Sequence, residues 1–193
     1  KTDSGNEYQG KQLVIDLQIG LSIDLPAECD AIQFNGSPIY GTENNDNLHG
    51  TNKNDLIIAL EGNDKVNTGS GNDCVIAGPG SNKVETGSGN DVVTGGEGDD
   101  TVETGSGIDV VYGFGGNNKI TTGSENDKVY TLDGDDNIDV GSCDDTVYAG
   151  GGNDRMSGGS GNDYLNGEAG ADRANAGSGT DTCMAEIKNS CEL

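Results

Sequence analysis

Residues 95–103, Gly-Gly-Glu-Gly-Asp-Asp-Thr-Val-Glu, are one copy of a nine-residue block that repeats sixteen times without a gap between Gly41 and Met184. The sixth place of the block is aspartate in all copies but two, which carry asparagine. The eighth place can sit in a dry interior in every copy, as Val102 can here. A fixed period that combines one apolar place with glycines ahead of a carboxylate is typical of stacked repeats that bury a shared core.

Blocks 95–103 and 158–166 fit the pattern Gly-Gly-x-Gly-x-Asp-x-U-x, where U is a large apolar residue. This block resembles the nonapeptide of the RTX (hemolysin-type) calcium-binding family. The resemblance implies an all-β fold, a right-handed parallel β-roll with two blocks per turn and about eight turns. It also implies that the first six residues of a block form a bend and the last three a short strand. The sequence agrees, because glycine permits bends that side chains forbid and the apolar place is flanked by two outward places.

The chain is therefore expected to have three parts. Residues 1–40 form a capping and strand segment, residues 41–184 form the roll, and residues 185–193 form a C-terminal tail closed by a disulfide.

With two blocks per turn, the sixth places fall into two columns on opposite edges of the roll. The first column is Asp55, Asp73, Asp91, Asp109, Asp127, Asp145, Asp163 and Asp181. The second column is Asp46, Asp64, Asn82, Asp100, Asn118, Asp136, Asp154 and Asp172. We expect the first column to be the better metal ladder, because it is unbroken. In the second column, Lys83 and Lys119 follow the asparagines, where they either replace the lost metal charge in part or are simply solvated.

Stacked aspartates repel one another unless a cation lies between them, and the chain carries a net charge of −24. This charge argues against nucleic acid or anionic lipid as a partner and for several Ca²⁺ ions, which prefer a shell of oxygen atoms. Both columns, asparagines included, are predicted metal ligands, and bend glycines are predicted to turn carbonyl oxygens toward the ions. These glycines are Gly69, Gly71, Gly87, Gly89, Gly105, Gly107, Gly123, Gly159 and Gly161. Without metal, repulsion and glycine entropy are expected to leave the roll largely unfolded.

The five cysteines form no metal-binding motif, so disulfides are the better interpretation. Cys183 and Cys191 flank the end of the last block, and a bridge from Cys29 to Cys74 would pin the leading segment to the roll. Cys143 is left over. Disulfides indicate an oxidising, extracellular compartment, where calcium is also abundant.

The two faces of the roll differ in their outward places. One face is polar, whereas the other is apolar over the first turns and lined with tyrosine further on. The alternation of apolar and other residues from Leu13 to Leu25 predicts a strand. This strand is expected to cap the apolar face, with pairing to another molecule as the rival interpretation.

Nothing in the chain predicts catalysis, since His49 is the only histidine and no catalytic motif is present. No apolar run is long enough to span a bilayer. The leading prediction is a secreted, calcium-folded structural protein of an extracellular or cell-surface assembly, which associates through its apolar and tyrosine face or its N-terminal strand.

Two alternatives remain open. A serine row beside several asparagines resembles the ice-binding rows of calcium-dependent antifreeze β-rolls, which would make this an ice-binding or adhesive surface. The row runs Ser70, Ser88, Ser106, Ser124, Ser142, Ser160 and Ser178. The other alternative is the non-catalytic, calcium-folded part of a larger secreted enzyme or toxin.

Overall fold

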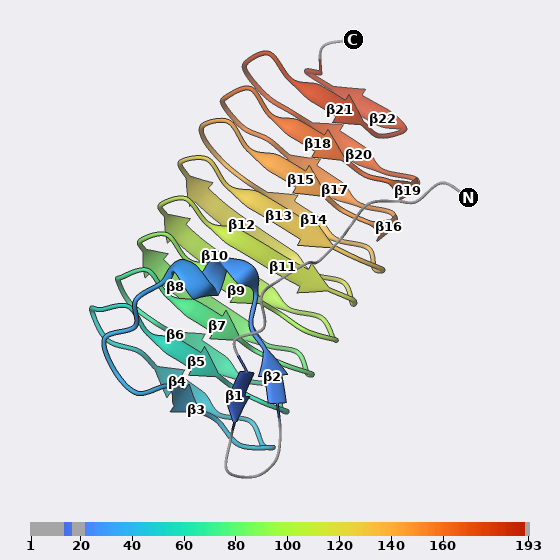
Figure 1. The fold of residues 1–193 in the computed structure, drawn as a ribbon. Helices are drawn as coiled ribbons and strands as arrows, with labels where there is room; N and C mark the ends of the chain where they lie inside the picture. Colours follow the sequence, from blue (N-terminus) through green and yellow to red (C-terminus); the bar gives the residue numbers. More distant parts are fainter. Residues whose placement is uncertain (1–13, 17–21, 192–193) are drawn as a thin grey trace.

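The computed structural model describes residues 14–16 and 22–191. Their main body is an all-β parallel solenoid of about eight turns with 18 residues per turn (Figure 1). Two nine-stranded sheets form its opposite faces, and bends at two edges join them. The predicted β-roll with two blocks per turn is confirmed.

The first face, called the polar sheet here, is built from parallel strands that all begin at the seventh place of a block or its equivalent. Its strands are β4 (Asn47–His49), β6 (Lys65–Asn67), β8 (Lys83–Ser88), β10 (Thr101–Ser106), β12 (Lys119–Ser124), β14 (Asn137–Asp139), β17 (Arg155–Ser157), β20 (Arg173–Asn175) and β22 (Ile187–Asn189). Val84 pairs with Val102, and Val102 with Ile120, so each neighbour lies one full turn away.

The second face, called the tyrosine sheet here, repeats this arrangement with the alternate blocks. Its strands are β3 (Ile39–Tyr40), β5 (Leu56–Ile58), β7 (Cys74–Ile76), β9 (Val92–Thr94), β11 (Val110–Phe114), β13 (Lys128–Thr131), β15 (Thr146–Tyr148), β18 (Tyr164–Asn166) and β21 (Thr182–Met184). A short additional pair, β16 (Gly151–Gly152) and β19 (Ala169–Gly170), extends one edge.

The core between the sheets is narrow, because each block sends inward mainly its eighth residue. Every eighth-place side chain except the half-buried Leu48 is buried. Small residues at the first place of some blocks, such as Ala59 and Ala77, fill the space beside them. Valine and isoleucine suit these positions, since branched side chains pack well on a pleated sheet.

The bends bring successive turns too close for ordinary side chains. At Gly87, φ is +95°, and a Cβ atom would lie 2.2 Å from the carbonyl oxygen of Gly69 in the preceding turn. Only glycine adopts this backbone region without strain and leaves room for that oxygen. The stacking of bends therefore depends on glycine as much as the stacking of strands depends on apolar residues.

The segment before the solenoid covers the apolar part of the tyrosine sheet. A 3₁₀ helix, η1 (Ala27–Ala31), lies across this sheet in Figure 1. Leu25 and Cys29 are buried against Leu56, Ile58 and Cys74. The predicted bridge from Cys29 to Cys74 is confirmed.

The prediction of one continuous strand from Leu13 to Leu25 is wrong. Two short strands, β1 (Val14–Asp16) and β2 (Ser22–Asp24), pair with each other in antiparallel fashion. A hairpin satisfies the backbone of both strands locally, whereas one long strand would need a partner along its whole length. Residues 1–13 and 17–21, which belong to the predicted capping segment, lie outside the described residues.

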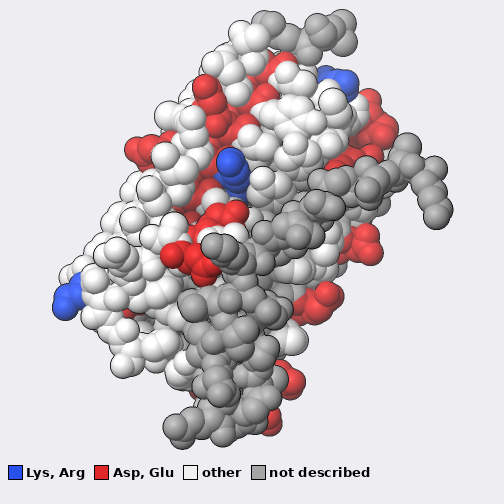
Figure 2. Space-filling view, in the orientation of Figure 1, with Lys and Arg blue, Asp and Glu red and all other residues white. Residues whose placement is uncertain are grey.

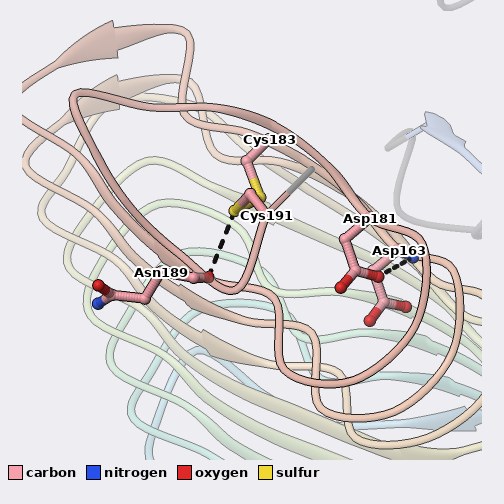
Figure 3. The surroundings of a disulfide bond; sticks show 5 residues. All are labelled: Asp163, Asp181, Cys183, Asn189 and Cys191. Atoms are coloured by element: carbon pink, nitrogen blue, oxygen red, sulfur yellow. Dashed lines mark hydrogen bonds between the residues drawn. A yellow bond between two sulfur atoms is a disulfide. The ribbon is translucent and has the colours of Figure 1, made fainter. Parts of the chain in front are cut away.

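The C-terminal segment continues the solenoid. Strand β22 pairs in parallel with β20, with Ile187 opposite Arg173, so residues after Met184 add a further strand to the polar sheet. Cys183 is bonded to Cys191, as predicted, and Figure 3 shows this bridge at the last turn. Cys143 is a free, exposed cysteine. The three-part division of the chain stays a prediction.

No helix within the described ranges is long and apolar enough to cross a membrane.

The two disulfides should differ in their contribution to stability. A bridge restricts the unfolded chain, and its effect grows with the length of the closed loop. Cys29 and Cys74 are 45 residues apart, and Cys183 and Cys191 are 8 apart. We expect Cys29→Ala/Cys74→Ala to lower the free energy of unfolding by about 4 kcal/mol, and Cys183→Ala/Cys191→Ala by about 2 kcal/mol. Denaturant unfolding with calcium present measures both, and an equal or larger loss in the C-terminal double variant would contradict this order.

Candidate functional site

The sixth-place residues line the two edges of the solenoid, as predicted from the repeat. The bends of the first column lead into the tyrosine sheet, and those of the second column lead into the polar sheet. Every sixth-place side chain except the half-buried Asp46 is buried. Buried carboxylates are unusual unless they are paired, so the partners of their oxygen atoms decide what the columns can do.

One oxygen of each side chain links neighbouring turns. The backbone N–H of a sixth-place residue donates to Oδ1 of the sixth-place residue 18 positions later, at 2.7–3.0 Å, all along both columns. Figure 3 shows the last link of the first column, from Asp163 to Oδ1 of Asp181. A carboxylate or an amide can serve here, because both offer an acceptor.

The second oxygen has no such partner. Oδ2 is buried without any hydrogen bond in twelve aspartates: Asp64, Asp73, Asp91, Asp100, Asp109, Asp127, Asp136, Asp145, Asp154, Asp163, Asp172 and Asp181. An unpaired buried anionic oxygen is costly, and native proteins seldom leave one without a hydrogen-bond donor or a cation. This repeated deficit is the most unusual chemical feature of the molecule.

The cost of these carboxylates is visible in their proton affinity. Burial raises the pKa of Asp145 to about 8. The hydrogen bond from the backbone of Asp127 acts in the opposite direction, and the charges of neighbouring aspartates add a smaller increase. Burial likewise raises the pKa of Asp91 and of Asp154 to about 7. The metal-free fold therefore disfavours the charged form of these side chains.

The asparagines of the second column reveal what surrounds the second oxygen. Nδ2 of Asn82 occupies the equivalent place and donates to the carbonyl oxygens of Gly78 and Gly80, at 2.9 and 3.4 Å. Nδ2 of Asn118 donates to the carbonyl oxygen of Gly116 at 3.1 Å. Carbonyl oxygens of the bend thus face the second side-chain atom of the sixth residue.

At bends with aspartate, the same register brings an anionic oxygen, instead of a donor, to these carbonyls. No three His, Cys, Asp or Glu side chains gather into a cluster within residues 14–16 and 22–191. A site here would instead combine carboxylate and backbone carbonyl oxygens. Such a set of acceptors without donors fits a hard divalent cation and suits calcium in particular.

The first turn satisfies its carboxylates differently. Oδ2 of Asp46 accepts hydrogen bonds from the backbone N–H and the hydroxyl of Thr42, at 2.6 and 2.9 Å. The backbone N–H and the hydroxyl of Thr51 likewise donate to Oδ2 of Asp55, at the same distances. Sequence reasoning missed both threonines, although each stands at a second place that is glycine in many later blocks.

The end of the second column also has a partner that sequence reasoning missed. The N–H of Asp172 donates to Oε2 of Glu186 at 2.7 Å. Glu186 lies 14 residues after Asp172 and not 18, so it falls outside the repeat register and gave no signal.

The predicted metal-binding glycines lie at the second and fourth places of the bends, with φ between 91° and 138°. Their role as carbonyl donors to an ion stays a prediction. The interpretation of Lys83 as a substitute charge is wrong, because its Nζ lies 2.5 Å from Glu85 on the outer side of the polar sheet. Lys119 is exposed.

The predicted serine row exists, because its members pair in register from turn to turn. The asparagines beside it have a structural role. Oδ1 of Asn72 accepts the N–H of Asn90 at 2.9 Å, and Oδ1 of Asn54 accepts the N–H of Asn72 at 2.8 Å. These amides form a backbone ladder along the bends. His49 is exposed on the polar sheet.

A profile of the RTX calcium-binding nonapeptide repeat matches the chain in four copies, at residues 40–73, 76–111, 112–147 and 148–183. These matches cover most of the chain and coincide with the solenoid. Proteins of this family are structural and calcium-binding, and generally not catalytic. A comparison with curated proteins gave no match. The chain belongs to the RTX calcium-binding nonapeptide repeat family.

Proposed function

We propose that this chain is a secreted structural protein whose solenoid folds around several calcium ions held by the two columns. One observation carries the proposal: twelve buried aspartates have an Oδ2 atom without any hydrogen-bond donor. Calcium supplies positive charge and accepts many oxygen ligands at flexible distances. Magnesium fits less well, since it demands a near-ideal octahedral shell and keeps several waters.

The first column is the stronger calcium ladder in this proposal. It has seven consecutive aspartates with an unpartnered Oδ2, from Asp73 to Asp181. In the second column, the corresponding atoms occur in five aspartates, and Asn82 and Asn118 interrupt the series. Calcium bound along both edges would tie each turn to the next, so the ions are structural components and not regulators.

Two observations support an extracellular location. The chain has two disulfides, which persist in oxidising compartments, and calcium is most abundant outside cells. The surface is also strongly acidic: the face in Figure 2 carries many acidic side chains and only isolated basic ones. Such a charge suits a protein that remains soluble among calcium ions.

The tyrosine sheet is the surface we propose for assembly with other copies. Tyr112, Tyr130, Tyr148 and Tyr164 follow one another along it, with neighbouring ring centroids 5.3–5.5 Å apart. The first three rings are stacked, and the ring of Tyr164 is tilted by 47° against that of Tyr148. The first turns of this sheet are covered by residues around η1, and Glu28 of that helix accepts a hydrogen bond from Tyr112. This cover favours capping as the role of residues 25–34, which leaves Tyr130, Tyr148 and Tyr164 as the half-buried aromatic surface beyond it.

Chelation tests the proposed function directly. With excess chelator at pH 8, we expect the β-sheet circular dichroism signal to be largely lost and the hydrodynamic radius to increase. Both should recover on addition of calcium, and much less on addition of magnesium at the same concentration. An unchanged β-sheet spectrum in chelator would overturn the proposal.

The dependence on calcium should itself depend on pH. Unfolded aspartate has a pKa near 3.9, whereas burial raises the pKa of Asp109 to about 6 and that of Asp145 to about 8. Because the folded pKa is raised, metal-free stability is greatest below pH 4 and is lost as the pH rises through about 6 to 8. Calcium binds the ionised carboxylates, so the calcium concentration at which half of the protein is folded should fall as the pH rises over the same interval. Circular dichroism titrations at pH 5.5 and 8 measure both trends, and a midpoint independent of pH would contradict the prediction.

Self-association should depend on the half-buried tyrosines beyond the cap. We expect Tyr130→Ser/Tyr148→Ser to weaken concentration-dependent association of the calcium-loaded protein by tenfold or more, because the aromatic contact area is lost. Thr121→Ser/Asn175→Ser, on the polar sheet, is the matched control and should associate as the unsubstituted protein does. Sedimentation velocity over a range of concentrations measures this. Equal association of both variants would exclude the tyrosine surface as the contact.

A further inference from the structure

Asn82 and Asn118 are the only sixth-place residues that carry a hydrogen-bond donor instead of a second carboxylate oxygen. Both are buried, and in both the amide oxygen and the amide nitrogen form hydrogen bonds. Oδ1 of Asn82 accepts the N–H of Asp64 at 2.9 Å, and Oδ1 of Asn118 accepts the N–H of Asp100 at 3.0 Å. The link between turns is therefore kept at both positions.

The other half of each amide performs a different task. At Asn82, Nδ2 donates to two carbonyl oxygens of its own bend, those of Gly78 and Gly80. At Asn118, Nδ2 donates to the carbonyl oxygen of Gly116. These carbonyls belong to the second and fourth places of the block, which the proposed calcium sites would use as ligands at the bends with aspartate.

An asparagine thus changes the chemistry of the bend in one step. It removes the anionic oxygen that needs a cation, and it adds the donor that the carbonyl oxygens need. The amide is neutral and nearly the same size as the carboxylate, so the ladder through Oδ1 is undisturbed. Unlike aspartic acid, which offers a donor only while it is protonated, asparagine combines an acceptor and a donor at any pH.

We infer that the side-chain amides of Asn82 and Asn118 each take the place of a calcium ion. The two bends of the second column that contain them would then fold without metal. This inference rests on the proposed function, because it assigns which bends hold an ion and which do not. The adjacent lysines do not perform this task, since Lys83 is engaged with Glu85.

In the first turn, other residues also supply hydrogen-bond donors where a cation would otherwise be needed. Thr42 and Thr51 each direct an N–H and a hydroxyl to the second oxygen of a sixth-place aspartate. Asp46 and Asp55 are thus satisfied by the protein itself. Four sixth-place positions in total have donors from the chain. Three of them lie in the first eight blocks, and the fourth, Asn118, lies in the ninth block.

The test converts each amide into a carboxylate and counts ions. In equilibrium dialysis at saturating calcium, we expect Asn82→Asp and Asn118→Asp each to bind one ion more than the unsubstituted protein, and the double variant two more. The folding midpoint for calcium should shift to higher concentration in each variant, because a donor has been lost. If the variants fold with calcium and bind the same number of ions as the unsubstituted protein, the inference is overturned.

The reverse substitution on the same column provides the matched control. We expect Asp100→Asn to bind one ion fewer while keeping its melting temperature in calcium close to that of the unsubstituted protein. Asp100→Ala should also bind one ion fewer, but it should melt at a clearly lower temperature because Oδ1 is lost as well. Equal melting temperatures of the two variants would contradict the role of the amide.

These results separate the inference from the proposed function. If the unsubstituted protein binds no calcium, the proposed function fails. If it binds calcium but the asparagine variants gain no ion, only the inference fails.

Discussion

The solenoid depends on the burial of two columns of carboxylates, each one turn from the next. In twelve aspartates the two carboxylate oxygens have opposite consequences. Oδ1 accepts an N–H from the preceding turn and stabilises the stack, whereas Oδ2 is buried without a donor. Replacing the aspartate by an apolar residue would remove the link, and keeping it without a counter-charge leaves an unpaired buried anion. Under the proposed function, a cation beside Oδ2 would resolve this conflict at the twelve aspartates without a donor, which would explain why one residue type recurs through so many blocks.

The apolar core cannot resolve the conflict by itself. It is one side chain wide per block, mostly valine, and the chain contains 34 glycines whose freedom is lost on folding. The fold therefore combines a thin hydrophobic core with tight backbone stacking, and the remaining stability must come from the edges.

The fold and the columns could be predicted from the sequence because the period carries the geometry: a nine-residue block fixes which residue lies above which. The bridge from Cys29 to Cys74 was predictable for the same reason, since the register placed Cys74 outward on the apolar face. Residues outside the register gave no such signal. The β1–β2 hairpin, the contact of Glu186 with Asp172 and the capping by Thr42 and Thr51 depend on local chain reversals and on single hydrogen bonds. The donor role of Asn82 was hidden because asparagine and aspartate share the acceptor that the register reveals.

Hydrogen-bond donors supplied by the protein are concentrated in the earlier turns of the solenoid, so the need for calcium should differ along its length. Thr42, Thr51, Asn82 and Asn118 supply donors at four positions, three of them in the first eight blocks and one in the ninth. The Cys29–Cys74 bridge and η1 also contact the first turns. After Asn118, both columns continue with aspartate alone, from Asp127 to Asp181. Under the proposed function, the N-terminal half thus needs fewer ions for the same number of turns. Because folding of a repeat array can begin at any repeat and spread to its neighbours, the less calcium-dependent turns are, under the proposed function, where folding would begin at low calcium.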